Sequence, residues 1–267
     1  PVIGLLASLG RTLVSVVRRP RVAILSSGDE LVEPDGSVEG GRIVASNSYT
    51  LSALCREVGA EPIYFGISKD CPEELEAHMR SGLSADCIVT SAGVSVGDHD
   101  HVKGVLEKLG CELRFWGVQM KPGHPMVFGR FDRGPAPGAA GPFVFGLPGN
   151  PVSAAVTFEQ FVRPALRKMS GFATHFRPTI QARLRTALRK QPGRLNFIRV
   201  CLEIEDGEIW ASSTGNQSSG VFRSMSEAQG LLVFPGVDSE LAEGSDVTVQ
   251  VIDEGFFAGH ERGFDGV

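Results

Sequence analysis

The sequence predicts an α/β domain with a mostly parallel, Rossmann-like sheet sandwiched by helices, followed by a small all-β barrel or sandwich. Two patterns predict this fold class. Short apolar strands alternate with helices from Arg21 to about Gly171, which is typical of parallel sheets covered on both faces. After Gly171 the chain changes to strand-like runs with no convincing helix between them. We therefore expect an α/β domain over 21–172 and a β domain over 173–267, with 1–20 as the end of a preceding domain.

Strand and helix signals follow one another through the α/β domain. An apolar run from Arg21 predicts the first strand, and Ser46 or Asn47 can cap a helix that Gly59 would end. Pro72 opens a further helix with acidic residues in its first turn, where the helix dipole favours them. The remaining expected elements are a short helix over 3–10, strands over 62–67, 85–91, 111–120, 126–131 and 143–147, and helices over 101–109 and 150–171.

The β domain is expected from a series of short runs. These runs cover 179–188, 197–204, 208–212, 231–234 and 247–252. Asp206-Gly207 lies between two of them and is a hairpin turn signal. A domain of about 80–90 residues lies within the usual size range.

Composition narrows the class of function. The 267 residues carry 26 Lys and Arg against 31 Asp and Glu, a net charge of -5, which argues against a nucleic-acid partner. Five cysteines are scattered singly with no CxxC pair, and this predicts reduced thiols and a cytoplasmic location. No apolar run approaches the ~20 residues that a membrane span requires, so we expect no membrane partner.

Four loops rich in Gly, Pro or Ser are candidate ligand-binding segments. They cover 27–30, 91–100, 121–125 and 147–151, and each is expected to follow a strand of the parallel sheet. The carboxyl ends of parallel strands share one edge, where open α/β sheets bind ligands. We therefore expect the four loops to converge on one pocket, although any one such loop, taken alone, is more often a plain turn.

The segment 90–100, T-S-A-G-V-S-V-G-D-H-D, carries the strongest chemical signal. Backbone N–H groups around Gly93 and Gly97 could cradle a phosphate, with the Ser91 and Ser95 hydroxyls as further donors. Two carboxylates follow at Asp98 and Asp100. With the acids of the 27–30 loop they could hold Mg²⁺ against phosphate oxygens, or they could merely cap turns and helices.

Charged residues of the other loops could complete an anion site. Asp29 and Glu30 are the acids of the first loop, and Lys121 is a cation held between Met120 and Pro122. His124 could donate a hydrogen bond or carry a charge near its pKa. By sequence alone Asp70 is a helix cap, Lys121 is equally well a surface lysine, and Arg194, Arg199, Gln217, Ser218 and Ser219 are polar loop residues able to donate to an anion.

Several common catalytic motifs are missing from the sequence. It contains no GxxxxGK[ST] phosphate loop, no GxGxxG dinucleotide fingerprint, no GxSxG nucleophile elbow and no HExxH metal pair. These absences argue against a standard P-loop ATPase and against nucleophilic serine chemistry.

Taken in order, the motifs resemble a known family. S-S-G-D-E-L at 26–31, S-N at 46–47, the 90–100 segment, M-K-P-G-H-P at 120–125 and G-L-P-G-N-P-V-S-A at 146–154 resemble the molybdopterin molybdenumtransferase family, MoeA and the E domain of gephyrin. G-R-L-N-F-I-R at 193–199 and the segment 215–219 resemble the C-terminal β domain of that family. The resemblance covers nearly the whole chain and identifies it as the C-terminal portion of such a protein.

The resemblance implies molybdenum cofactor biosynthesis, by insertion of molybdate into adenylylated molybdopterin with Mg²⁺-assisted hydrolysis of the adenylate. It implies a homodimer and, as further partners, other proteins of molybdenum cofactor biosynthesis. The catalytic residues that it implies are Glu30, Asp70, Asp100, Lys121 and His124, with Asp98 and Asp100 as metal ligands. The implied substrate-binding residues are Gly28, Asp29, Asn47, Ser91, Gly93, Ser95, Gly97, Pro148, Gly149, Asn150, Pro151, Arg199 and Ser218.

The sequence departs from the family pattern at three points. Ala92 replaces a glycine in the 90–100 loop, and His124 stands where many members have a second lysine. Most of the N-terminal half of the family is absent, so we expect weak binding and little turnover from this chain by itself. A non-catalytic pterin-binding or scaffold module of the same fold is therefore the alternative. A CinA-like nucleotide hydrolase is a third possibility, which the Gly93-Val94-Ser95 loop disfavours.

Overall fold

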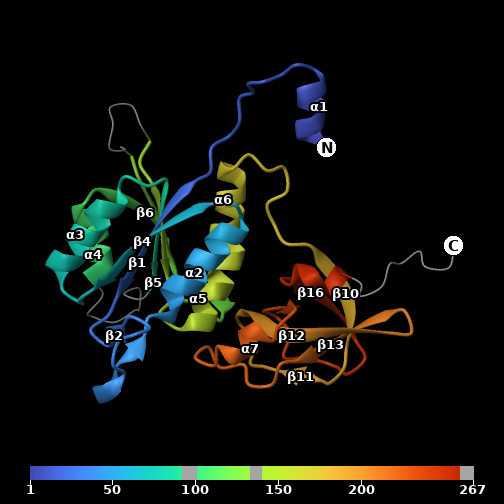
Figure 1. Ribbon diagram of the computed structural model, residues 1–267. Coiled ribbons are helices and arrows are strands. Elements are labelled where there is room, and N and C mark those ends of the chain that lie inside the picture. Colours follow the sequence, from blue (N-terminus) through green and yellow to red (C-terminus); the bar gives the residue numbers. More distant parts are fainter. Residues whose placement is uncertain (92–100, 133–139, 259–267) are drawn as a thin grey trace.

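The computed structural model describes residues 1–91, 101–132 and 140–258, and Figure 1 shows its arrangement. A central six-stranded sheet has the strand order β4-β1-β5-β9-β8-β6. The strands are β1 (Arg21–Ser27), β4 (Glu61–Ser68), β5 (Cys87–Ser91), β6 (Cys111–Trp116), β8 (Val127–Phe131) and β9 (Phe143–Leu147). The pairs β4–β1, β1–β5 and β5–β9 are parallel, and only β8 runs against its neighbours in this sheet. The predicted mostly parallel α/β sheet is confirmed.

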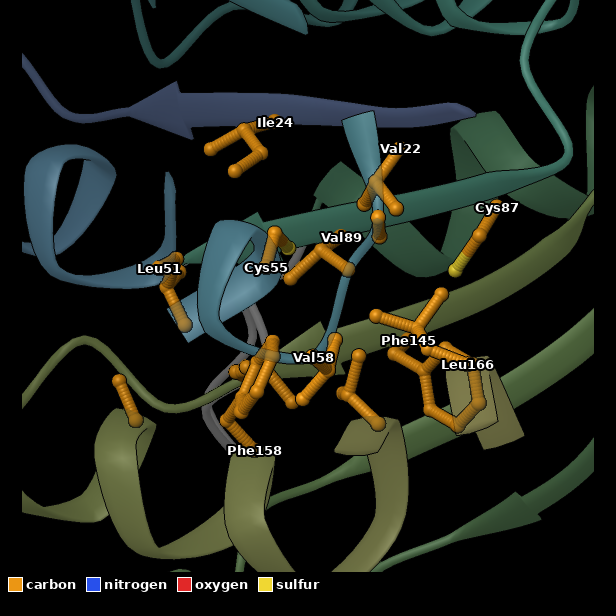
Figure 2. Close-up of a cluster of buried hydrophobic side chains, with 14 of the residues drawn as sticks. Val22, Ile24, Leu51, Cys55, Val58, Cys87, Val89, Phe145, Phe158 and Leu166 are labelled. Carbon is orange, nitrogen blue, oxygen red and sulfur yellow. The ribbon is translucent and has the colours of Figure 1, made fainter. Parts of the chain in front are cut away.

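Helices cover both faces of this sheet because its central strands are apolar on both sides. The helices are α2 (Ser46–Glu57), α3 (Pro72–Gly82), α4 (His101–Lys108), α5 (Pro151–Thr157) and α6 (Arg163–Met169). In β1, Val22 and Ile24 point to the core under α2 and α5, which Figure 2 shows. Ala23 and Leu25 point to the opposite core under α3 and α4. This alternation follows from the two-residue period of a strand.

Two helix starts differ from the sequence prediction. Ala45, not Ser46 or Asn47, is the N-cap residue of α2, and no side chain caps it. Cys71 holds that position before α3, so Asp70 is not a cap. In α2 the Asn47 side chain bonds instead to a distant loop, because tertiary contacts compete with local capping.

The predicted long helix is continuous from Pro151 to Met169 but changes its geometry midway. The stretch η2 (Phe158–Val162) is a π-helical turn between α5 and α6. Gly171, at a φ of 78°, follows its end as expected for a left-handed helix stop. Such π-turns are rare and are often found near functional sites.

A second sheet closes into a barrel. Its strands β13 (Glu208–Ser213), β10 (Thr179–Leu184), β16 (Asp246–Val251), β14 (Gly230–Phe234) and β12 (Leu195–Glu205) pair in that order, and β12 pairs again with β13. The hairpin between β12 and β13 turns at Asp206 and Gly207, which both have positive φ, at 51° and 80°. The predicted barrel and this hairpin are confirmed. The short helix α7 (Arg223–Ser226) and the pair β11 (Leu188–Arg189) and β15 (Glu240–Leu241) are additions to the predicted elements.

The strand predicted over 111–120 is two strands in two different sheets. β6 ends at Trp116, and Gly117 has a φ of 89°, which breaks the strand. β7 (Met120–Lys121) then pairs in parallel with β12 of the barrel, with Asn196 opposite Lys121. The α/β part of the sequence therefore contributes a strand to the barrel sheet.

A buried ion network also joins the two parts. Arg177, in the connection to the barrel, donates to Glu159 of the π-turn at 2.9 Å and contacts Glu57 at the end of α2. Arg163 lies 3.3 Å from Glu57. The side chains of Arg177 and Glu159 are only 3% and 2% exposed, so this pair is withdrawn from water.

The N-terminal segment stands away from the body of the molecule (Figure 1). The predicted short helix is present as α1 (Val2–Ser8), none of whose residues is buried. Arg18 lies in the segment between α1 and β1 and forms an ion pair with Asp86, the residue that precedes β5. Across the described residues, no helix is both long and apolar enough to span a membrane. All five cysteines are free thiols.

Candidate functional site

Two cavities meet beside the carboxyl edge of the parallel sheet. The first, the sheet-edge cleft, has a volume of about 640 Å³ and lies between β1, β5, α2 and the turn before α5. The second, the junction cavity, has a volume of about 1100 Å³ and lies between the loop after β7 and the barrel. Pro125, Pro148 and Asn150 line both cavities, so the two cavities are neighbours that share these residues as a wall.

A cluster of buried hydroxyl groups lies at the sheet-edge cleft: Ser26 and Ser91 line the cleft, and Ser48 contacts Ser26 without lining it. The Ser26 Oγ, at the end of β1, lies 2.8 Å from the Ser48 Oγ and 3.1 Å from the Ser91 Oγ. All three side chains are buried. Hydroxyl groups both donate and accept, so this cluster can present either function to a polar ligand.

Glu30 lines the same cleft from the turn after β1. Gly28 has a φ of 148°, and a Cβ there would lie 2.7 Å from the Glu30 carboxylate. Only glycine therefore lets the Glu30 carboxylate lie against this turn. Behind it, the Gly28 N–H donates to the Ser68 carbonyl oxygen at 3.2 Å and joins the turn to β4.

Two tyrosines fix the segment that follows Glu30. The Glu33 carboxylate accepts from the Tyr49 hydroxyl at 2.9 Å and from the Tyr64 hydroxyl at 2.8 Å. Burial and the Glu33 carboxylate raise the pKa of Tyr64 to about 12, so this hydroxyl remains a donor at neutral pH. β2 (Leu31–Val32) pairs with β3 (Ile43–Val44) and completes the wall of the cleft.

The loop 147–151 is joined to α2 across the cleft. The Asn47 Nδ2 donates to the Gly149 carbonyl oxygen at 2.7 Å. Pro148, Gly149, Asn150 and Pro151 all line the cleft. The Val152 N–H at the start of α5 donates to the Ser219 carbonyl oxygen at 3.2 Å, so this turn also contacts the barrel.

Lys121 and His124 line the junction cavity on the α/β side. Lys121 is an exposed residue of β7, and its backbone is fixed by pairing with β12. The His124 Nδ1 lies 2.7 Å from the Val118 carbonyl oxygen. Because a carbonyl can only accept, Nδ1 carries the proton there, and the opposite ring nitrogen is the acceptor in the neutral ring.

Gly123, between these two residues, packs closely against α5. Its φ is 106°, and a Cβ there would lie 2.5 Å from the Thr157 Cγ2. Thr157 is fully buried. The loop therefore reaches its position only with glycine at 123.

Arg199 lines the barrel side of the junction cavity but is 1% exposed. Its guanidinium donates to the Ser224 Oγ at 3.1 Å and to the Asn216 and Ser218 carbonyl oxygens at 3.3 and 3.2 Å. Burial lowers the pKa of Arg199 to about 10. These hydrogen bonds position the loop that carries Ser218. They differ from the direct oxyanion contact expected from the sequence.

The charges around the junction cavity have one sign. Its titratable lining residues are Lys121, His124, Arg189, Lys190, Arg194 and Arg199, and none of the described residues that line it is Asp or Glu. Several cations without carboxylates create a positive potential that attracts anions.

The structure brings together most, but not all, of the predicted site residues. Glu30, Asn47 and Ser91 line the cleft, while Lys121, His124 and Ser218 line the junction cavity. The Asp29 carboxylate accepts a hydrogen bond from the Asp70 N–H at 3.2 Å. Neither Asp29 nor Asp70 is among the described residues that line the two cavities. The remaining predicted residues, Gly93, Ser95, Gly97, Asp98 and Asp100, lie outside the described residues.

The expected placement of one loop was wrong. The 121–125 loop does not lead from a parallel strand into a helix, because it connects β7 of the barrel sheet to the antiparallel strand β8. It reaches the other loops from the barrel side instead. The loops at 27–30, 121–125 and 147–151 are therefore better described as contributing to two cavities that share a wall, and the 91–100 loop beyond Ser91 lies outside the described residues.

Sequence reasoning also missed several residues of the site. Ser26 was not named as a site residue although it opens the S-S-G-D-E-L string at 26–31, and Ser48, which contacts it, gave no motif signal. Ser153 lines the junction cavity and lies in the G-L-P-G-N-P-V-S-A string, which could have identified it. The role of Glu33 could not have been predicted, because the two tyrosines that donate to its carboxylate are distant in the sequence.

The described residues include only part of the expected Mg²⁺ site. Within residues 1–91, 101–132 and 140–258, no group of three or more His, Cys, Asp or Glu side chains could hold a metal ion. Glu30 is the carboxylate that lines the cleft in the described part. The expected ligands Asp98 and Asp100 lie outside that part, so the described residues alone do not form a Mg²⁺ site.

Comparison with known proteins extends this picture. Residues 23–168 match a family described as "Probable molybdopterin binding domain", and residues 181–252 match "MoeA C-terminal region (domain IV)". A molybdopterin molybdenumtransferase of Nostoc sp. is 40% identical over 250 residues, which are 92% of this chain and 56% of that protein. The corresponding Haemophilus influenzae protein is 37% identical, over 92% of this chain and 59% of its own length.

Two further relatives agree. Gephyrin of Dictyostelium discoideum is 35% identical over 94% of this chain and 39% of its own length. A MoeA protein of known structure from Pyrococcus horikoshii has a TM-score of 0.76 at 30% identity, over 93% of this chain and 58% of that chain. The chain thus spans somewhat more than half the length of the molybdenumtransferases that it matches. Because both matched regions occur in order and these relatives align along nearly its whole length, the chain belongs to the MoeA-like molybdopterin molybdenumtransferase family, as its motifs predicted.

Proposed function

We propose that this chain acts in molybdenum cofactor biosynthesis as part of a molybdopterin molybdenumtransferase. It binds a molybdopterin-type pterin in the sheet-edge cleft and molybdate in the junction cavity. The observation that carries this proposal is the shared wall of Pro125, Pro148 and Asn150, which places a cleft with buried hydroxyl groups directly beside a cavity whose described lining residues include several cations and no carboxylate.

The charge distribution supports an anionic ligand in the junction cavity. A buried cation such as Arg199 is costly unless hydrogen bonds or an anion compensate its charge. Its described hydrogen bonds go to neutral oxygens of the barrel loop. Molybdate and phosphate are both tetrahedral oxyanions, so the Lys121 ammonium and the Ser218 hydroxyl are suitable donors to either, and the His124 ring can donate through its second nitrogen only when it is protonated.

The cleft supports a polar ring system. The Ser26 and Ser91 hydroxyls can satisfy donors and acceptors of a pterin, and the Glu30 carboxylate can accept from its N–H groups. Asn47 acts indirectly, because its amide already holds the Gly149 carbonyl across the cleft.

The proposed reaction is hydrolysis of adenylylated molybdopterin coupled to molybdate insertion. Insertion forms two Mo–S bonds with the dithiol of the pterin and breaks one Mo–O bond, and that oxygen leaves as water with the two thiol protons, so molybdenum keeps its oxidation state. Hydrolysis consumes one water, breaks a P–O bond of the phosphoanhydride, and gives AMP and the pterin phosphate. Mg²⁺, when bound, would neutralise charge on the phosphate oxygens. Lys121 and Glu30 keep their proposed catalytic roles because they line the two cavities. The proposed roles of Asp70, Asp98 and Asp100 still depend on the sequence alone.

The remaining expectations are part of this proposal. A homodimer, contacts with other proteins of the same pathway and a cytoplasmic location follow from the family resemblance. Complete turnover is proposed for a protein that carries the full length of the family, since this chain spans 56% to 59% of the two bacterial relatives described above.

The experiment that tests the function is AMP release. The full-length protein is incubated with adenylylated molybdopterin, Mg²⁺ and molybdate, and AMP is measured by chromatography with each component omitted in turn. We expect AMP release to require both Mg²⁺ and molybdate, and Asp100→Asn to abolish it with the fold intact. Tight pterin binding with no AMP release would contradict the enzyme and favour the non-catalytic binding module.

A further inference from the structure

The barrel carries a rigid turn at the mouth of the junction cavity. This turn, residues 190–194, connects β11 to β12. Gly193 has a φ of 128°, and its N–H donates to the Gly236 carbonyl oxygen at 2.7 Å. A residue with a Cβ would be strained at that φ. The turn is therefore held in one conformation by its backbone.

The Lys190 side chain forms hydrogen bonds with the backbone at the same turn. Its ammonium donates to the Arg194 carbonyl oxygen at 3.2 Å and to the Gly236 carbonyl oxygen at 3.4 Å. The ammonium also lies 4.8 Å from the centre of the Phe234 ring. The charge of Lys190 is thus used to fix the backbone of Arg194, so the position of Arg194 is set before any ligand arrives.

Arg194 and Arg189 differ in their partners although both line the cavity. The Arg189 guanidinium pairs with Glu240 at 3.0 Å. Arg194 is exposed, and no carboxylate of the described residues forms an ion pair with it. An arginine whose backbone is fixed, without an acidic partner among the described residues and at a cavity whose described lining residues include no acid, is suited to bind an anion.

Lys121 lies on β7, and Arg194 directly precedes β12, the strand with which β7 pairs. The backbone of Lys121 pairs with Asn196, two residues after Arg194. The cavity of about 1100 Å³ is much larger than a tetrahedral oxyanion, which occupies roughly the volume of four waters, about 120 Å³. One oxyanion at Lys121 therefore leaves most of the cavity for a second anionic group.

We propose that Arg194 binds a phosphate group of the pterin-class ligand, at a subsite distinct from the oxyanion position at Lys121. This inference rests on the proposed function, because it takes the ligand of the cavity to be a phosphorylated molecule together with molybdate. The planar guanidinium can donate two parallel hydrogen bonds to phosphate oxygens. Arg194 is then a binding residue that selects phosphorylated ligands.

The test separates the two subsites with two small probes, inorganic pyrophosphate and molybdate. Their dissociation constants are measured by calorimetry, at one fixed low salt concentration, for the wild-type chain and for Arg194→Gln, Lys121→Gln and the control Arg223→Gln. Arg223 pairs with Glu227 at 2.6 Å and does not line the cavity. We expect Arg194→Gln to weaken pyrophosphate binding about tenfold, as loss of a charged hydrogen bond does, and to leave molybdate binding within twofold. Arg223→Gln should change neither constant more than twofold.

The outcomes distinguish this inference from the proposed function. Pyrophosphate binding unchanged in Arg194→Gln, or no pyrophosphate binding by the wild-type chain, would overturn the subsite. Equal losses for both probes would also overturn it, because they would indicate a single shared site. Molybdate binding that survives Lys121→Gln, together with a pyrophosphate loss in Arg194→Gln, would remove the proposed oxyanion position and leave the Arg194 subsite standing.

Discussion

The side-chain amide of Asn47 donates a 2.7 Å hydrogen bond to the Gly149 carbonyl oxygen, and this bond connects α2 to the turn before α5. It crosses the sheet-edge cleft, and residues beside Gly149 also line the junction cavity. The width of the cleft and the position of the shared wall therefore depend on one side chain.

Asn47→Ala should loosen this connection. We expect a loss of about 1 kcal/mol in the free energy of unfolding, the usual net value of one hydrogen bond. Pterin binding should weaken as well, because the 147–151 turn loses its fixed position. The measurements are urea unfolding and ligand titration. Ser81→Ala, which removes a hydroxyl bonded only within its own helix, is the control and should affect stability alone.

Gly123→Ala should destabilise the protein by roughly 1–3 kcal/mol, because the new methyl group overlaps Thr157 and the φ of 106° is unfavourable for alanine. Gly104→Ala is the matched control. It lies in α4 with nothing within 4 Å of its added Cβ, so we expect a gain of up to ~1 kcal/mol there. Equal stability changes in the two variants would show that the contact with Thr157 does not matter.

Glu159→Gln removes one charge from the buried network around Arg177. Breaking such a pair leaves a buried cation poorly compensated, and we expect a loss of about 3 kcal/mol in unfolding free energy. The comparison is Glu208→Gln, in an exposed pair with Arg183 at 3.2 Å, which should cost less than ~1 kcal/mol. Raising the salt concentration should reduce the loss of unfolding free energy in Glu208→Gln but not the loss in Glu159→Gln. A loss at 159 as small as that at 208 would contradict the structural role of the network.

Asp86 should contribute a pH-dependent stability. Partial burial opposes its ionisation, but hydrogen bonds from the Arg18 guanidinium and the Arg21 N–H outweigh this and lower the pKa of Asp86. A carboxyl with a lowered folded-state pKa stabilises the fold above its unfolded pKa and loses that contribution as the pH falls through its folded pKa.

The stability difference between wild type and Asp86→Asn should therefore be present at pH 7 and shrink as the pH falls below about 4. It should stay near 1 kcal/mol or less because the pair is largely exposed. Unfolding of Asp86→Asn, Arg18→Ala and the double variant across this pH range measures the coupling. A difference that stays constant from pH 7 to pH 2 would refute the linkage.

Lys121→Ala should weaken molybdate use more than pterin binding. Its backbone pairing with β12 does not depend on the side chain, so the fold should persist. Molybdate binding by equilibrium dialysis should fall about tenfold, whereas pterin binding should change little. Lys69→Ala, an exposed lysine near Glu74, is the control. Equal losses for molybdate and pterin would count against an oxyanion role for Lys121.

Most of the architecture could be predicted from local sequence patterns. Alternating apolar runs and glycine stops indicated the parallel sheet and its helices, because these signals lie within a few residues of the elements they define. Asp206-Gly207 indicated its hairpin for the same reason, since both residues accept positive φ.

The errors occurred where distant residues decide the structure. Nothing near 117–121 indicates that β7 pairs with a strand more than seventy residues later. Asn47 was expected to be a cap, but a carbonyl a hundred residues away takes its amide. Long-range hydrogen bonds of this kind leave no local signal.

The strand β7 has a consequence for attempts to divide the protein. Cutting the chain near residue 172 would leave Met120 and Lys121 with an unpaired strand edge in one piece, and would expose the flank of β12 in the other. Bare backbone edges of this kind recruit other chains. Separately expressed halves should therefore reassociate with each other or aggregate, and a split version of this protein would work as a complementation pair.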